Sequence, residues 1–116
     1  MKTKHETPEN FDSAFVNVTL SAARLINGKP SINDLSTAAK GDWVMSEDAA
    51  KKIKYIYPVR KNQILGVFEV LDYTMLVTPD QTRVRFTLKA IFEGRTPLLE
   101  SAVSNLTATN FVVKYF

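Results

Sequence analysis

Few residues of this chain have the chemistry of a catalytic or metal-binding group. The single histidine is His5, and there is no cysteine. The acidic residues most suited to proton transfer are scattered: Asp42, Glu69, Asp72 and Glu93. General acid–base catalysis and metal binding need such groups within hydrogen-bonding or coordination distance of one another. The sequence therefore predicts a protein that is not an enzyme, with no metal site and no cofactor.

Aromatic residues in the middle of the chain suit the binding of flat rings. Trp43 is the only tryptophan, and Tyr55 and Tyr57 lie two residues apart. An indole at the mouth of a cleft stacks on a nucleobase with about 1–3 kcal/mol. A lone tryptophan beside a glycine also commonly completes a hydrophobic core, so both interpretations of Trp43 stay open. The two tyrosines are expected to pack inward, with their hydroxyls at the rim.

Positive charge is concentrated in the same region. The net charge is +3, and residues 40–95 carry ten cations against seven anions. Arg83, Arg85 and Lys89 share one strand face, because residues two apart on a strand point the same way. Three cations in such a row can contact successive phosphates of a nucleic acid. The other interpretation is that they lie on an outer strand face exposed to solvent. The candidate phosphate-binding residues are Lys51, Lys52, Lys54, Arg60, Arg83, Arg85 and Lys89.

These residues favour a non-catalytic binding module that recognises nucleic acid or a nucleotide through a basic strand face and an aromatic cleft. Its predicted ligand-binding residues are Trp43, Lys54, Tyr55, Tyr57, Arg60, Arg83, Arg85 and Lys89. The alternative is a protein-interaction module, either a homodimer or an inhibitor of a larger protein, that does not bind nucleic acid. Residues 71–77 support this alternative, because an apolar run without clean alternation leaves some side chains exposed. Those side chains are Leu71, Met75, Leu76 and Val77.

Capping residues predict two short helices in the first half of the chain. Ser31 and Gly41 bound a helix over 32–39, because serine accepts hydrogen bonds from the first free N–H groups and glycine tolerates the positive φ that ends a helix. Ser46 opens a second helix that ends by Lys52, with acidic residues in its first turn.

Alternating apolar residues predict strands before and after these helices. A strand is expected over 14–20, and a hairpin over 53–59 and 64–71. Since Pro58 has no N–H for the ladder, the first hairpin strand is expected to lie at a sheet edge or to end near that residue. Gly66 indicates a bulge or the close approach of another group.

The clearest strand covers 83–92 and is followed by a helix and a last strand. Val84, Phe86 and Leu88 face the core, because they alternate with polar residues. A helix is expected over 98–106 and a strand over 111–116. The inward side chains of that last strand are predicted to be Phe111, Val113 and Tyr115.

This order predicts an α+β fold, in which a sheet of five to six strands curls into a small barrel with two to three short helices. Residues 13–116 form the single domain, and the polar residues 1–12 are expected to be a flexible tail. No run approaches the ~18 apolar residues of a membrane helix. With 45% hydrophobic and 23% charged residues, the sequence predicts a soluble, cytoplasmic protein.

Parts of the sequence resemble small PUA-like modules, including the ASCH and EVE types. The similar segments are Gly41-Asp42-Trp43, Ile56-Tyr57-Pro58-Val59, Ile64-Leu65-Gly66-Val67-Phe68-Glu69-Val70, Phe92-Glu93-Gly94-Arg95 and Asn110-Phe111-Val112-Val113-Lys114-Tyr115. The resemblance covers residues 13–116 and implies a pseudobarrel that recognises RNA, modified bases or nucleotides in a cleft. The chain lacks the G-x-K-x-x-E-x-R signature of the ASCH type, so no ASCH ligand is carried over.

Overall fold

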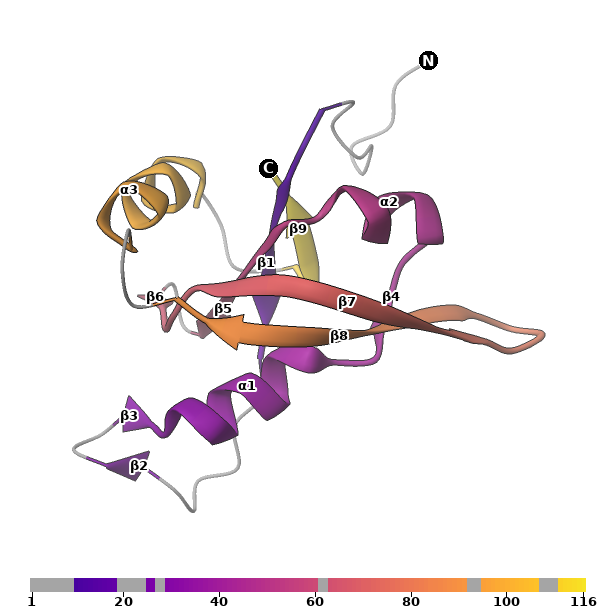
Figure 1. Cartoon of the computed structure of the whole chain (residues 1–116), viewed down its shortest axis with the longest axis horizontal. Coiled ribbons are helices and arrows are strands. Elements are labelled where there is room, and N and C mark those ends of the chain that lie inside the picture. The colour runs from indigo at the N-terminus through magenta and orange to yellow at the C-terminus, as the bar shows by residue number, and fades with distance from the viewer. Residues whose placement is uncertain (1–9, 19–24, 27–28, 61–62, 92–94, 107–110) are drawn as a thin grey trace.

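The computed structural model describes residues 10–18, 25–26, 29–60, 63–91, 95–106 and 111–116 (Figure 1). Its strands are β1 (Ser13–Asn17), β2 (Leu25–Ile26), β3 (Lys29–Pro30), β4 (Trp43–Val44), β5 (Tyr55–Arg60), β6 (Gln63–Ile64), β7 (Phe68–Val77), β8 (Thr82–Ala90) and β9 (Val113–Tyr115). Its helices are α1 (Ile32–Lys40), α2 (Glu47–Lys52) and α3 (Arg95–Asn105). No helix in the described part of the chain has the length and apolar character needed to cross a membrane.

One curled, mixed sheet organises the domain. Its strand order is β4-β8-β7-β5-β1-β9, with β6 paired beside β5, while β2 and β3 form a separate small hairpin. The β1–β5 pair is parallel, whereas β9, β7 and β8 pair with their neighbours in antiparallel fashion. The sheet curls into a nearly closed barrel, which confirms the predicted α+β fold with short helices.

Strand β5 lies in the middle of the sheet and is buried on both faces. Ile56 belongs to a core that α1 covers, whereas Tyr57 and Val59 belong to a second core that also contains Ala102 of α3. The predicted edge position was therefore wrong, whereas the alternative, that the strand ends near Pro58, is confirmed because β5 ends at Arg60. The Pro58 carbonyl accepts a hydrogen bond from the Leu65 N–H at 2.8 Å. The nitrogen of Pro58, which has no hydrogen to donate, therefore lies on the side of β5 that faces the segment between β6 and β7.

Both predicted helix caps are present. The Ser31 hydroxyl accepts a hydrogen bond from the Asp34 N–H at 3.1 Å, and the Ser46 hydroxyl accepts one from the Ala49 N–H at 3.1 Å. At the other end of α1, Gly41 has a φ of 72°. These side-chain and backbone preferences, which are local to each helix end, fix where α1 and α2 begin and where α1 ends.

The predicted register of β8 is also confirmed. Val84 and Phe86 are fully buried, whereas Arg85, Thr87 and Lys89 are exposed. The strand therefore contributes one apolar face to the core beneath α1, as its alternation requires. Phe92, at the end of the predicted strand, lies outside the described residues.

Two other segments differ from the predictions. The chain between β6 and β7 is irregular because Gly66 lies against α1: a Cβ at Gly66 would stand 3.1 Å from Leu35 Cδ2. This is the predicted close approach, but it divides the expected strand 64–71 in two. Phe111 packs against Phe15 in the second core. It does not share the face of Val113 and Tyr115, because it precedes β9 and its ring lies on the other side of the sheet.

Candidate ligand-binding pocket

A pocket of about 600 Å³ opens where three distant segments meet. Backbone hydrogen bonds hold these segments together: the Asp12 carbonyl accepts from the N–H groups of Lys54 (2.6 Å) and Tyr55 (3.2 Å), and the Phe116 carbonyl accepts from Ser13 (3.1 Å). The pocket therefore joins the residues before β1, the link from α2 to β5, and the residue after β9. Its volume lies within the usual range for small-molecule sites, about 300–1,000 Å³.

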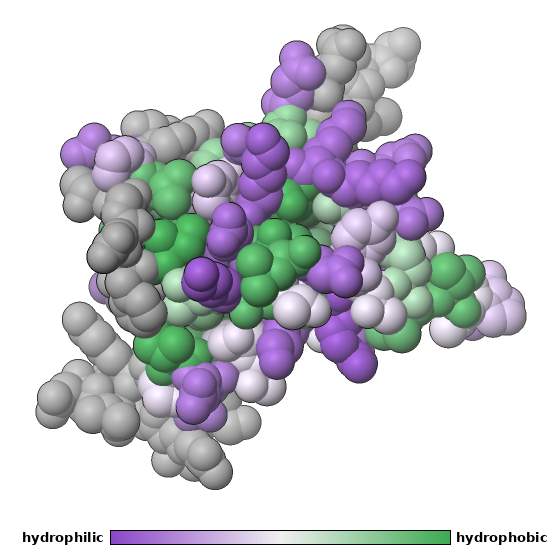
Figure 2. Space-filling model, in the orientation of Figure 1, coloured by the Kyte–Doolittle hydropathy of each residue, from purple (hydrophilic) through white to green (hydrophobic). Residues whose placement is uncertain are grey.

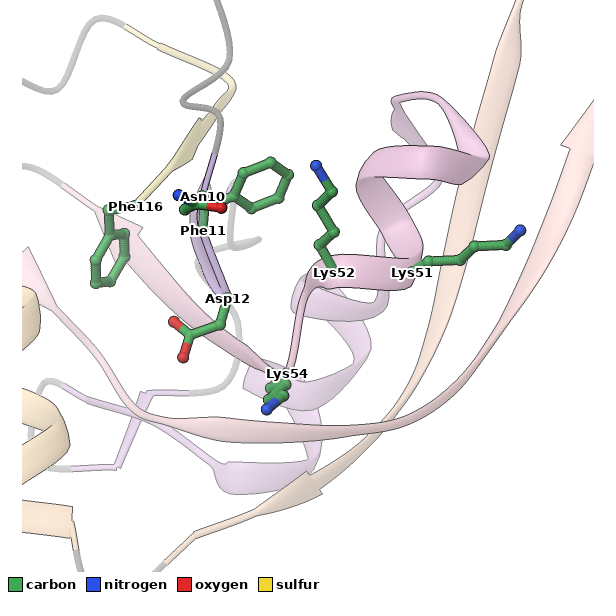
Figure 3. A pocket seen from close by; sticks show the side chains of 7 residues that line it. All are labelled: Asn10, Phe11, Asp12, Lys51, Lys52, Lys54 and Phe116. Carbon is green, nitrogen blue, oxygen red and sulfur yellow. The ribbon is translucent and has the colours of Figure 1, made fainter.

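Cations and aromatic rings dominate the lining. The residues are Asn10, Phe11, Asp12, Lys51, Lys52, Lys54 and Phe116 (Figure 3). The ammonium of Lys52 lies 5.3 Å from the centre of the Phe11 ring, a cation–π distance. Figure 3 shows Lys51 directed away from the other six side chains, whereas the Lys52 side chain extends beside the Phe11 ring.

Other aromatic rings pack against Phe11 and Phe116 and fix their positions. Phe11 packs on Tyr115 with 4.7 Å between ring centroids. Phe116 stacks on Phe15 at 4.3 Å and contacts Tyr57 at 5.3 Å. Both phenylalanines are only half-buried, so each presents part of its ring to the pocket. A planar group that enters the pocket meets aromatic surface that is already in place.

Among the lining residues, Asp12 is the one with a carboxylate side chain. It is exposed, and one of its oxygens accepts a hydrogen bond from the Ser13 hydroxyl at 2.8 Å. Lys52 and Lys54 outnumber this side-chain carboxylate, so the pocket favours an anionic ligand. The Asp12 carboxylate is also placed to accept a hydrogen bond from a hydroxyl or amino group of that ligand.

The lysines of this pocket were predicted from the sequence, whereas its phenylalanine rings were not. Phe11 and Asp12 were assigned to a flexible tail, yet residues 10–12 are tied to Lys54 and Tyr115, so the folded domain begins before residue 13. Residues 1–9 lie outside the described residues. The apolar ring of Phe11 in an otherwise polar segment was the available signal, whereas the position of Phe116 depends on the β1–β9 pairing, which the sequence does not reveal.

Trp43 does not line the pocket, and its contacts stabilise the C-terminal end of α1. Its indole N–H donates a hydrogen bond to the Ala39 carbonyl at 2.8 Å, and its half-buried ring packs against the core beneath α1. The ring also covers Gly41, where any Cβ would overlap the indole. These contacts account for Trp43 as a structural residue, and the aromatic surface of the pocket comes from Phe11 and Phe116 instead.

Both tyrosines that were predicted to contact the ligand, Tyr55 and Tyr57, belong to β5. Tyr57 is only 1% exposed within the second core, which corrects its assignment as a ligand contact, because a buried ring offers no surface to a ligand. Burial also raises the pKa of the Tyr57 hydroxyl above its ordinary value. Tyr55 is half-buried against the same core, and Arg60 is half-buried at the end of β5, opposite Gln63. Neither Tyr55 nor Arg60 lines the pocket.

The cations predicted on β8 have hydrogen-bond partners or acidic neighbours. Arg85 makes two hydrogen bonds to the Asp42 carboxylate, at 2.9 and 3.1 Å. Arg83 donates to the Asp42 carbonyl at 2.9 Å. On β7, Glu69 pairs with Lys89 and Asp72 pairs with Thr87. Three acidic side chains thus lie near the three cations and lower the positive potential of this face, so phosphate binding by β8 stays a prediction.

The Arg85 guanidinium, by hydrogen bonding, holds the pKa of the Asp42 carboxyl below its ordinary value of 3.8. A lowered folded-state pKa stabilises the protein above that ordinary value, and this contribution is lost as the pH falls below it. We therefore expect Asp42→Asn to be less stable than the wild type at neutral pH, with a difference that shrinks below about pH 4. Urea denaturation of both proteins at neutral and acid pH measures this, and a difference that does not change with pH would contradict the ion pair.

The described residues offer no gathering of three or more His, Cys, Asp or Glu side chains suited to a metal ion. Comparison of the chain with protein-family models, curated proteins and solved structures gave no match. The resemblance to PUA-like modules thus stays a prediction from the sequence, while the candidate site rests on the geometry of the pocket.

Proposed function

We propose that this protein is a non-catalytic binding module for a nucleotide or a nucleotide unit of a nucleic acid, and that this ligand occupies the pocket at Phe11, Lys54 and Phe116. The observation that carries the proposal is the combination of lysines with fixed aromatic surface in one cavity. A nucleotide carries both matching chemistries, since its base has a π-face and its phosphates are anionic.

Each part of the pocket has a partner on such a ligand. Lys52 and Lys54 contact phosphate oxygens, and Lys51 at the end of α2 adds to the positive potential around the opening. Phe11 or Phe116 packs on the base, and Asp12 accepts a hydrogen bond from a sugar hydroxyl or an exocyclic amine. Lys51 and Lys52 also lie in the last turn of α2, where a positive charge stabilises the helix. A binding experiment separates this structural role from phosphate binding.

Charge reversal at Lys54 is the sharpest test of this proposal. The Lys54 side chain is exposed while its N–H is fixed to Asp12, so Lys54→Glu changes the pocket without removing a core contact. We expect it to weaken binding of a mononucleotide or a short single-stranded oligonucleotide at least about tenfold, because a charge-assisted hydrogen bond is lost. Isothermal titration calorimetry of both proteins measures the change.

Lys89→Glu is the matched control, since it makes the same charge change on the exposed face of β8. It is expected to leave the affinity nearly unchanged at moderate salt. Wild-type affinity should also fall as salt rises, because each neutralised phosphate releases counterions. Equal losses from the two variants, or no binding by the wild type at about 50 mM salt, would refute the pocket as the ligand site.

A second candidate function is protein interaction, and the far end of the β7–β8 hairpin favours it. Leu71 and Val77 are 56% and 72% exposed. Single exposed apolar residues are common on soluble proteins, but these two belong to one long strand. The edge of that strand supports a specific inference, which does not depend on the pocket.

A further inference from the structure

The β7–β8 hairpin extends beyond the body of the domain as a two-stranded ribbon (Figure 1). On one side of the ribbon, β4 pairs with Arg83 and Val84 of β8. On the other side, β5 pairs with β7 only at Phe68 and Glu69. From Tyr73 to Val77, β7 is therefore an edge strand among the described residues. Figure 2 shows hydrophobic surface toward this end of the molecule.

The direction of the backbone groups on this edge follows from the hairpin. The Thr78 N–H donates to the Gln81 carbonyl at 2.9 Å, so Thr78 faces β8. Backbone groups alternate along an antiparallel strand, hence those of Tyr73, Met75 and Val77 point away from β8. Edge groups of this kind are the template for pairing with another strand.

Both ends of this edge are closed. The outward N–H of Tyr73 already donates to the Asp72 carboxylate at 2.8 Å, beside a bulge between Val70 and Asp72. Pro79, at the tip, has no N–H. The open stretch is therefore Met75–Val77, and among the described residues the N–H groups of Met75 and Val77 have no hydrogen-bond partner.

We propose that this edge pairs with the same edge of a second copy of the chain, antiparallel and centred on Leu76. In that register Met75 and Val77 of each copy exchange four hydrogen bonds, which use every open N–H on the two edges. Leu76 faces its own counterpart, and Thr74 faces Thr78. The segment 73–78 carries no charge, so within it the two-fold pairing places no like charges opposite each other, and the acidic residues Asp72 and Asp80 lie just beyond its ends.

This choice of partner rests on the chemistry of the edge. Natural proteins commonly protect an exposed edge strand with lysine or other charges, whereas residues 73–78 combine β-branched, aromatic and aliphatic side chains without any. The edge strand itself offers no cation to a nucleic acid, and the two arginines beside it on β8, Arg83 and Arg85, already bond to Gln81 and Asp42. The contact is short, far below the area of about 1,200 Å² typical of stable complexes, so the dimer is weak and depends on protein concentration.

Cross-linking tests the register directly, because the chain has no cysteine. Leu76→Cys places two thiols in a non-hydrogen-bonded pair, where the Cα atoms are about 4.5 Å apart and a disulfide fits. Val112→Cys is the matched control, since Val112 is 66% exposed on another part of the chain. Under mild oxidation at high protein concentration, we expect Leu76→Cys to form disulfide dimers at least about tenfold faster than Val112→Cys.

Sedimentation velocity of the cysteine-free protein supplies the second measurement. Wild type should shift toward dimer as its concentration rises, and Val77→Lys should stay monomeric while Val112→Lys behaves like wild type. Equal cross-linking rates, or a dimer that survives Val77→Lys, would overturn the proposal. A wild type that remains monomeric up to millimolar concentration would overturn it as well.

Discussion

Replacing Phe86 with alanine is expected to lower the free energy of unfolding by about 3–5 kcal/mol. The side chain is 1% exposed and belongs to the core beneath α1, together with Val84 and Leu35. Its removal leaves a cavity that the surrounding sheet and helix cannot fill completely. Small domains have a total stability of about 5–15 kcal/mol, so the loss is a large fraction of the whole. Chemical denaturation followed by circular dichroism measures it.

Arg85→Ala is the matched control one residue away. Arg85 is exposed on the opposite face of β8 and contributes an exposed ion pair to Asp42, so its loss is expected to change stability little. Losses of similar size from Phe86→Ala and Arg85→Ala would contradict the burial of alternate β8 residues.

Replacing Gly41 with alanine is expected to cost about 2–4 kcal/mol, an unusually large effect for so small a change. Two causes act together. The backbone at Gly41, with φ 72° and ψ −153°, lies in a region that is essentially restricted to glycine. In addition, a Cβ there would overlap the Trp43 indole, which must then move away from its hydrogen bond to Ala39.

A double-mutant cycle separates these two causes. In a Trp43→Ala background the indole is absent, so Gly41→Ala retains only the backbone cost, and the two changes should be clearly non-additive. Thermal or urea denaturation of the four proteins gives the interaction energy. Additive losses would show that the indole does not limit the space at Gly41.

Local rules predicted α1, α2 and β8 well, for physical reasons that lie within a few residues of each element. The serine at the start of α1 satisfies N–H groups of its own first turn, and the alternation of Val84 with Arg85 decides which face of β8 is buried. A sequence displays such short-range relations directly.

The position of β5 and the make-up of the pocket depend on pairings between distant segments. Pro58 indicated an edge strand, yet β5 became central because a parallel neighbour, β1, and the helix α3 cover it. The pocket needs Phe11, Lys54 and Phe116 to meet through the hydrogen bonds of Asp12 and Ser13. No periodicity in the sequence predicts that these distant residues lie together, so only the lysines of the pocket were predicted.

Strand β1 has one neighbour from the middle of the chain and another from its far end. Ala14 pairs with Ile56 on one side and with Tyr115, about 100 residues later, on the other. Closing such long loops costs entropy before any contact repays it, so folding is expected in the slow, millisecond-to-second range of sheet-rich domains. During synthesis on the ribosome, β1 emerges long before β9, and its apolar residues remain without their second partner until the last strand has left the exit tunnel.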